Sequence, residues 1–173
     1  MSTIEIERKF LLASDAWRLQ AEQLGIAGQK MVQGYLSRDP ARSVRVRIAG
    51  QSAWLTIKGI SHGASRAEFE YPIPSDEAEQ LLRLCEGPVI NKNRYRLPIA
   101  GDDRHWEIDE FFGDNAGLLV AEIELSDEQQ ALPHATWLGR EVTGDKRYYN
   151  SSLSQRPFCQ WSARERSEHF DKH

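Results

Sequence analysis

The chain has 173 residues, and its 22 Lys and Arg residues against 26 Asp and Glu residues give a formal charge of −4. This length fits one domain with a sizeable core, and a charged fraction of 28% does not indicate disorder. The acidic balance argues against nucleic acid as a partner. No apolar run approaches the ~20 residues of a membrane span, and the first residues are too charged for a secretory signal. We therefore expect a cytoplasmic protein without a membrane partner.

Capping patterns predict three helices, each beginning at or after a serine. The serines are Ser14, Ser75 and Ser126. The first helix is expected over about 15–24 and the second over 76–85. The third follows a capping-box pattern in which Gln129 stands three residues after Ser126, and Pro133 ends it early. A fourth, shorter helix is expected around 148–153.

Strict alternation of apolar and polar residues, the period of a β-strand, marks eight further segments. They are residues 4–10, 30–37, 44–48, 54–58, 68–73, 92–97, 106–111 and 118–125. Eight strands with short or helical connections predict an antiparallel sheet, open or closed on itself. The predicted fold class is α+β.

The charged positions within each segment share one face, because side chains two residues apart in a strand point the same way. Four segments carry acidic pairs, namely Glu5 with Glu7, Glu68 with Glu70, Glu107 with Asp109, and Glu122 with Glu124. Two segments carry basic sets, namely Arg45 with Arg47, and Lys92 with Arg94 and Arg96. Periodicity alone favours a solvated face. The sorting of charges by sign favours a site instead, because neighbouring like charges repel.

Such a site would combine a hard cation with a polyanion. Carboxylate oxygens suit Mg²⁺ or Mn²⁺, whereas the Cys and His spacings typical of zinc or copper sites are missing. Mg²⁺ commonly takes one or two carboxylates and completes its shell with water and phosphate oxygens. Arg and Lys would bind the remaining phosphate oxygens. The charge pattern therefore indicates a site for a metal and a phosphorylated ligand.

The segment Glu5-Ile6-Glu7-Arg8-Lys9 has the ExExK form that marks the CYTH domain, also called the triphosphate tunnel metalloenzyme family. The chain resembles this family in further motifs that follow in the same order. They are QGYL at 33–36, VRVR at 44–47, TIKG at 56–59, EFEY at 68–71, KNRY at 92–95, EID at 107–109 and AEIE at 121–124. The resemblance covers residues 3–154 and ends in a segment typical of short bacterial members. It implies one domain over 1–155, followed by a polar tail over 156–173.

The resemblance implies an eight-stranded antiparallel β-barrel that forms a tunnel, with helices packed outside. The implied metal ligands are Glu5, Glu7, Glu122 and Glu124, supplemented by Glu107 or Asp109. The implied substrate-binding residues are Lys9, Arg45, Arg47, Lys58, Lys92, Arg94 and Arg147, the last of which would close the tunnel end. Lys9 and Lys58 are candidates to stabilise the leaving oxygen. Glu68 and Glu70 are candidates for a catalytic base or for ligands of a second metal.

The activity that the resemblance implies is metal-dependent hydrolysis of a triphosphate, foremost of inorganic tripolyphosphate to diphosphate and phosphate. The alternatives are a class IV adenylyl cyclase that makes cyclic AMP from ATP, a thiamine triphosphatase, and a non-catalytic polyphosphate- or nucleotide-binding module. The complete set of glutamates favours an enzyme over the module. The expected cofactor is Mg²⁺ or Mn²⁺ and the expected partner is a triphosphate-containing small molecule, with a homodimer left open beside a monomer.

Overall fold

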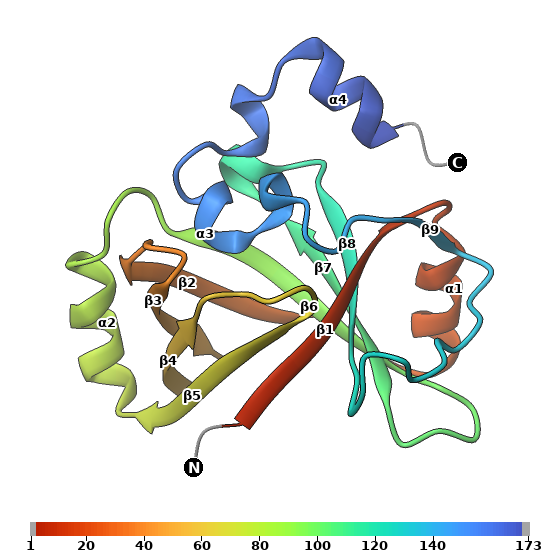
Figure 1. Cartoon of the computed structure of the whole chain (residues 1–173), viewed down its shortest axis with the longest axis horizontal. Coiled ribbons are helices and arrows are strands. Elements are labelled where there is room, and N and C mark those ends of the chain that lie inside the picture. The colour runs from red at the N-terminus through yellow and green to blue at the C-terminus, as the bar shows by residue number, and fades with distance from the viewer. Residues whose placement is uncertain (1–2, 171–173) are drawn as a thin grey trace.

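The computed structural model describes residues 3–170, which form a nine-stranded sheet with helices around it (Figure 1). The strands are β1 (Thr3–Leu12), β2 (Gln29–Ser37), β3 (Arg42–Ala49), β4 (Ser52–Gly59), β5 (Ser65–Ile73), β6 (Ile90–Pro98), β7 (His105–Phe111), β8 (Leu119–Glu124) and β9 (Leu138–Glu141). The α-helices are α1 (Ala16–Gln23), α2 (Ser75–Arg83), α3 (Asn150–Leu153) and α4 (Ala163–Phe170). Three short 3-10 helices are η1 (Gly113–Asn115), η2 (Lys146–Tyr148) and η3 (Phe158–Gln160). Each of the predicted strands is present, and β9 is a strand that the alternation did not predict.

The first eight strands close into an antiparallel barrel. Their order is β5-β4-β3-β2-β6-β7-β8-β1, and β5 pairs with β1 to complete the ring. One edge of β1 serves two partners, β5 through residues 3–6 and β9 through Phe10 and Leu12. Its other edge pairs with β8. The predicted α+β fold with an eight-stranded antiparallel barrel is therefore confirmed.

Apolar side chains on the outside of the wall are covered by helices. α2 packs Ala78 against Val46 and Ala53, and α1 packs Trp17 against a second cluster that includes Trp106. The two helices lie on opposite sides of the barrel (Figure 1). Because the apolar positions of these strands point outward, the charged alternate positions point into the barrel. Within residues 3–170, no helix combines the length and the apolar character needed to cross a membrane.

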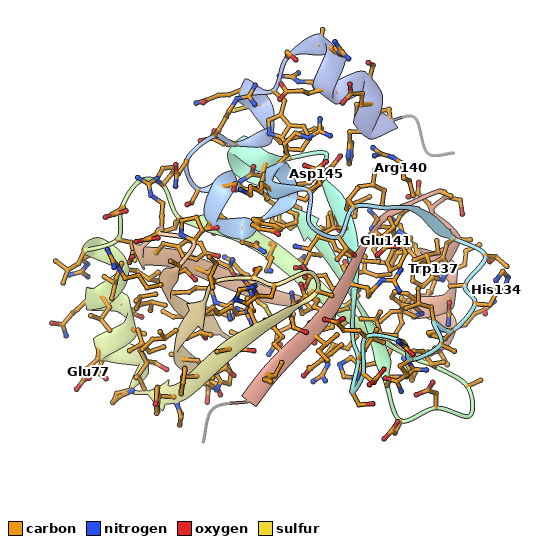
Figure 2. All side chains as sticks on the ribbon, in the orientation of Figure 1. Glu77, His134, Trp137, Arg140, Glu141 and Asp145 are labelled. Atoms are coloured by element: carbon orange, nitrogen blue, oxygen red, sulfur yellow. The ribbon has the colours of Figure 1, made fainter. Side chains whose placement is uncertain are left out.

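The helix predicted from Ser126 is wrong. Residues 126–137 connect β8 to β9 without a helix, and the Gln130 side chain accepts hydrogen bonds from both the backbone N–H and the hydroxyl of Ser126. These local bonds offer the backbone an alternative to helical pairing. The segment runs over the outer wall, where buried Trp137 donates a hydrogen bond of 3.0 Å to Gln20 on α1 (Figure 2).

The predicted cap at Ser75 is also wrong, although the helix itself is confirmed. α2 begins at Ser75 after Pro74, and the Ser75 hydroxyl donates to the Gln51 carbonyl at 2.7 Å instead of accepting from the helix. The helix after Ser14 is confirmed as α1, and the Ser14 hydroxyl oxygen accepts from the N–H of Ala16 at 3.4 Å. Local sequence therefore located both helices but not the bonds at their first turns.

One end of the barrel interior is filled by apolar side chains instead of charged ones. Leu11, Phe111 and Val120 continue the inward-facing positions of β1, β7 and β8, and Tyr148 and Leu153 pack against them. We call residues 143–151 the closing segment, because it covers this end and includes η2 and the first residues of α3. The interior is therefore charged along its middle and sealed by apolar contacts at this end.

The residues after 155 add to this apolar end. Phe158 and Trp161 are buried, and the Trp161 ring makes edge contacts with Tyr148 and Phe158 at centroid distances of 5.2 and 5.0 Å. Glu168 on α4 accepts a hydrogen bond of 2.9 Å from Arg147 in η2. The segment expected as a polar surface extension thus includes aromatic residues that pack against the closing segment.

Replacing Trp161 with Ala should lower the free energy of unfolding by about 3 kcal/mol, because it leaves a cavity between buried aromatic rings. Chemical denaturation followed by circular dichroism measures this loss. Phe170→Ala is the control, since that side chain is 57% exposed and its loss should cost under about 1 kcal/mol. Equal, small losses for both variants would show that the extension adds nothing to the core.

Candidate active site

The charged inner faces of the strands surround a cavity of about 680 Å³. Most of the predicted site residues line it, and they come from strands far apart in sequence. They are Glu5, Glu7, Lys9, Arg45, Arg47, Lys58, Glu68, Glu70, Arg94, Glu107, Glu122 and Glu124. Three predicted residues are not in the lining, namely Lys92, Asp109 and Arg147. The structure therefore brings together most of the predicted metal-binding, substrate-binding and catalytic residues.

Arg147 lies away from the cavity. Its guanidinium donates to Asp145 at 2.7 Å and to Glu168 at 2.9 Å, and it lies 5.7 Å from the centre of the Trp161 ring. Figure 2 shows Asp145 beside the barrel, below the α4 region. Arg147 thus joins the closing segment to α4, and this placement does not support a direct substrate contact.

Glu5 is held by two cations. Lys58 on β4 donates to it at 2.7 and 2.8 Å, and Arg66 on β5 donates at 3.1 Å. Burial would raise the pKa of Glu5, but Lys58 and Arg66 together lower it to about 2. Arg66 was missed in the sequence, although it stands two residues before Glu68 and alternation places both on the same face.

Lys9 and Glu122 form a second buried pair between β1 and β8. They lie opposite each other in the ladder, and the Lys9 ammonium is 3.0 Å from the Glu122 carboxylate. Burial would raise the pKa of Glu122, but Lys9 and then Arg94 lower it to about 2. The same ammonium donates to the carbonyl of Tyr148 at 3.2 Å, so the closing segment contacts this pair.

Asp109 joins Lys92 and Arg94 inside the barrel, and of these three residues only Arg94 lines the cavity. Its carboxylate accepts from Lys92 at 2.6 Å and from Arg94 through two bonds of 2.7 Å. Lys92 and Asp109 have no exposed surface. Burial would raise the pKa of Asp109, but Arg94 and Lys92 hold it well below its usual range. This buried group therefore supports Arg94, which does line the cavity.

The two carboxylates of β5 lie near cations of the strands β3 and β4. Glu68 lies 3.7 Å from Lys58, and Glu70 lies 3.7 Å from Arg45 while accepting a hydrogen bond of 2.9 Å from Thr56. Burial raises the pKa of Glu68. A carboxylate with a raised pKa binds a proton more readily, which suits a catalytic base.

Among residues 3–170, the half-buried side chains of Glu7 and Arg47 line the cavity without an ion pair. Glu7 makes no ion pair, and burial followed by repulsion from Glu122 raises its pKa to about 7. Arg47 makes no ion pair either, and burial together with Arg45 and Arg94 lowers its pKa to about 9. A charged group that is partly withdrawn from water and makes no ion pair is costly. The cavity therefore favours binding of both a cation and an anion.

The carboxylates on β1 and β8 fit a hard divalent cation. Glu7 lies opposite Glu124 in the ladder, and Glu5 and Glu122 are near enough to raise the pKa of Glu7. Oxygen donors of this kind suit Mg²⁺ or Mn²⁺. Within residues 3–170, no three carboxylate, His or Cys side chains already surround one point. Glu5 pairs with Lys58 and Glu122 pairs with Lys9. These two ammonium groups therefore neutralise carboxylates that a divalent cation would also bind.

Loops supply further lining residues that alternation could not reveal. Arg104 and His105 come from the connection of β6 to β7 and the first residue of β7, and Tyr149 and Asn150 come from the closing segment. The positions of these four residues depend on how the connecting segments fold over the barrel, and not on the two-residue repeat of a strand. Tyr35 of the motif QGYL also lines the cavity, although no role was predicted for it from the sequence.

A closed antiparallel barrel with acidic and basic residues around an inner cavity is the architecture expected of triphosphate tunnel enzymes. The CYTH domain matches residues 3–157 of this chain, so the protein belongs to the CYTH family. Metal dependence is typical of this family.

Two relatives share most of their length with the chain. An inorganic triphosphatase of Acetivibrio thermocellus is 48% identical over 155 residues, covering 89% of this chain and 95% of the relative. An inorganic triphosphatase of Nitrosomonas europaea is 37% identical over 157 residues, covering 87% and 96%. A crystal structure of an inorganic triphosphatase superposes with a TM-score of 0.58 at 32% identity, covering 87% of this chain and 97% of that one. A putative adenylate cyclase from Bacillus halodurans shares the fold, with a TM-score of 0.55 at 16% identity, covering 73% and 83%.

Proposed function

We propose that this protein is a metal-dependent inorganic triphosphatase that hydrolyses tripolyphosphate to diphosphate and phosphate. The observation that carries the proposal is that the Glu7 carboxylate and the Arg47 guanidinium line the cavity and make no ion pair with another side chain among residues 3–170. A complex of a divalent cation with a triphosphate supplies both missing charges at once. The relatives named inorganic triphosphatase, at 48% and 37% identity, support this activity over the alternatives.

The basic residues of the lining would bind the phosphate oxygens. They are Lys9, Arg45, Arg47, Lys58 and Arg94, with Arg66 as an addition from the structure. Arg can bind two oxygens through its planar fork, and Lys acts as a point charge. Lys92 would act through Asp109 and Arg94, because its ammonium is bonded to Asp109 and does not line the cavity.

Glu5, Glu7, Glu122 and Glu124 would hold the divalent cation, with Glu107 as a further carboxylate of the lining. We propose Mg²⁺ or Mn²⁺, since both suit carboxylate and phosphate oxygens. Bound there, the cation would neutralise charge on the phosphates and so help to stabilise the transition state.

In the proposed reaction, a water oxygen forms a bond to the terminal phosphorus as the bond to the bridging oxygen breaks. The electrons of the broken bond stay on the departing diphosphate, whose charge Lys9 and Lys58 would stabilise. Glu68 or Glu70 would accept the proton of the water. Catalysis would then come mainly from positioning and electrostatics. We also propose that the protein is cytoplasmic.

The proposal predicts which substrate is consumed. The purified protein, supplied with Mg²⁺ or Mn²⁺, should release diphosphate and phosphate from tripolyphosphate, and a chelator should abolish the release. ATP and thiamine triphosphate, assayed in parallel with product identification, are the comparison substrates. Cyclic AMP from ATP, or thiamine triphosphate as the preferred substrate, would overturn the assignment. Binding of tripolyphosphate without turnover would indicate a non-catalytic module.

A further inference from the structure

Two amide side chains connect the closing segment to Arg47. The Arg47 Nε donates to Oε1 of Gln33 at 3.2 Å, and Nε2 of Gln33 donates to Oδ1 of Asn150 at 3.0 Å. Gln33 on β2 is fully buried and lies directly opposite Arg47 in the ladder with β3. Asn150 is the first residue of α3 and lines the cavity. The three side chains therefore form a continuous chain of hydrogen bonds that reaches Arg47.

The direction of each bond in this chain is fixed by chemistry. A guanidinium can only donate, so the oxygen of the Gln33 amide must face Arg47. The nitrogen of the same amide then faces Asn150, which must present its oxygen. One arrangement of the two amides satisfies both bonds, so Arg47 is held in one orientation.

The closing segment gives this chain a fixed anchor. Tyr148, two residues before Asn150, is buried and packs against Trp161. Its carbonyl accepts the Lys9 ammonium at 3.2 Å, and the Asp145 carboxylate accepts the backbone N–H of Arg147 at 3.1 Å. Asn150 is thus presented from a packed backbone, which limits how far its amide can move.

The use of an amide, rather than a carboxylate, sets Arg47 apart from the other predicted phosphate-binding residues of the lining. Lys9, Arg45, Lys58 and Arg94 each make an ion pair with a carboxylate. A neutral amide can orient a guanidinium through a hydrogen bond and leave its full charge available to an anion. We propose that Gln33 and Asn150 are positioning residues that orient Arg47 for a phosphate group of the substrate without neutralising it. This inference rests on the proposed function.

Binding of inorganic tripolyphosphate in the absence of divalent cations tests the inference. Isothermal titration calorimetry would compare the wild type with Gln33→Glu, Asn150→Ala, Arg47→Ala and the double variant Asn150→Ala/Arg47→Ala, all treated with a chelating resin. Ser152→Ala is the matched control, because Ser152 is on α3 but does not line the cavity. Thermal melts would confirm that each variant is folded.

Gln33→Glu keeps the shape and the acceptor but cancels the charge of Arg47, so Kd should rise by about tenfold or more. Asn150→Ala should raise Kd by roughly three- to tenfold in the wild-type background and have almost no effect when Arg47 is already Ala. Ser152→Ala should leave Kd unchanged. If Gln33 and Asn150 had a purely structural role, Gln33→Glu would bind tripolyphosphate with the Kd of the wild type, or Asn150→Ala would raise Kd equally with Arg47 and with Ala at position 47. Either result overturns the inference. A wild type that binds tripolyphosphate neither in this buffer nor with Mg²⁺ added would instead overturn the proposed function.

Discussion

Glu7→Gln and Glu5→Gln are expected to abolish the same activity and to change stability in opposite directions. Both carboxylates are proposed metal ligands, so each variant should lose metal-dependent phosphate release by about 100-fold or more. Glu7 makes no ion pair among residues 3–170, and burial and Glu122 raise its pKa to about 7, outweighing the opposite effect of Lys9 and Lys58. Glu5 is bonded to Lys58 and Arg66, which lower its pKa to about 2 despite its burial. The pKa of Glu7 is therefore raised, whereas the pKa of Glu5 is lowered.

The stability effects follow from these surroundings. In the unfolded chain a Glu carboxyl ionises near its ordinary pKa, so at pH 8 the raised pKa of Glu7 makes its ionised form unfavourable in the fold. Gln has no such cost, and Glu7→Gln should leave the metal-free protein at least as stable as the wild type. Glu5→Gln leaves Lys58 and Arg66 without their shared carboxylate, which should cost about 1–3 kcal/mol.

Circular dichroism melts in metal-free buffer at pH 8, together with Mn²⁺ binding by calorimetry, would measure both effects. Each variant should bind Mn²⁺ more weakly than the wild type. Near-normal activity in both variants would show that the metal assignment is wrong. A loss of stability in Glu7→Gln as large as in Glu5→Gln would show that Glu7 is compensated in the fold.

Asp109→Asn should be the most destabilising substitution in the barrel wall, with a loss of about 3–5 kcal/mol. The Asp109 carboxylate has no exposed surface and compensates both Lys92 and Arg94 through bonds of 2.6 and 2.7 Å. The amide would leave two buried cations with less negative charge nearby. Urea denaturation followed by circular dichroism measures the loss.

A second substitution separates the loss of the charge pair from a general defect. Lys92→Met in the Asp109→Asn background removes one of the uncompensated cations and should restore part of the lost stability. Lys92→Met alone should be less destabilising than Asp109→Asn, because Asp109 keeps Arg94 as a partner. If Asp109→Asn keeps wild-type stability and loses only metal affinity, Asp109 is a metal ligand as the sequence predicted.

Strand positions and their charged faces could be predicted because they depend on local periodicity. The alternation in segments such as 5–9 and 122–124 placed Glu5, Glu7 and Lys9, and likewise Glu122 and Glu124, on one face of a strand, and the structure turns that face toward the cavity. The connections were harder to predict. The capping-box pattern at Ser126 is satisfied by Gln130 in a turn, and β9 is too short to show an alternation of its own.

The partners of the charged residues could not be predicted from periodicity. Whether a given Arg or Glu is paired depends on strand register and on contacts between residues distant in the chain. Gln33 and Asn150, which are 117 residues apart, meet only because the closing segment covers the end of the barrel. Arg147 belongs to a motif of the family resemblance but pairs with Glu168 on α4, outside the cavity.

The sequence by itself therefore determined which side chains share a face of each strand, because a strand repeats every two residues whatever its neighbours are. Tertiary structure decided which of these charges form ion pairs, which lie outside the cavity lining, and which line the cavity without an ion pair. Closing the sheet through the pairing of β1 with β5 makes the charged faces surround one cavity. It leaves Glu7 and Arg47 there without an ion pair among residues 3–170, because electrostatic interaction depends on distance in space and not on distance along the chain.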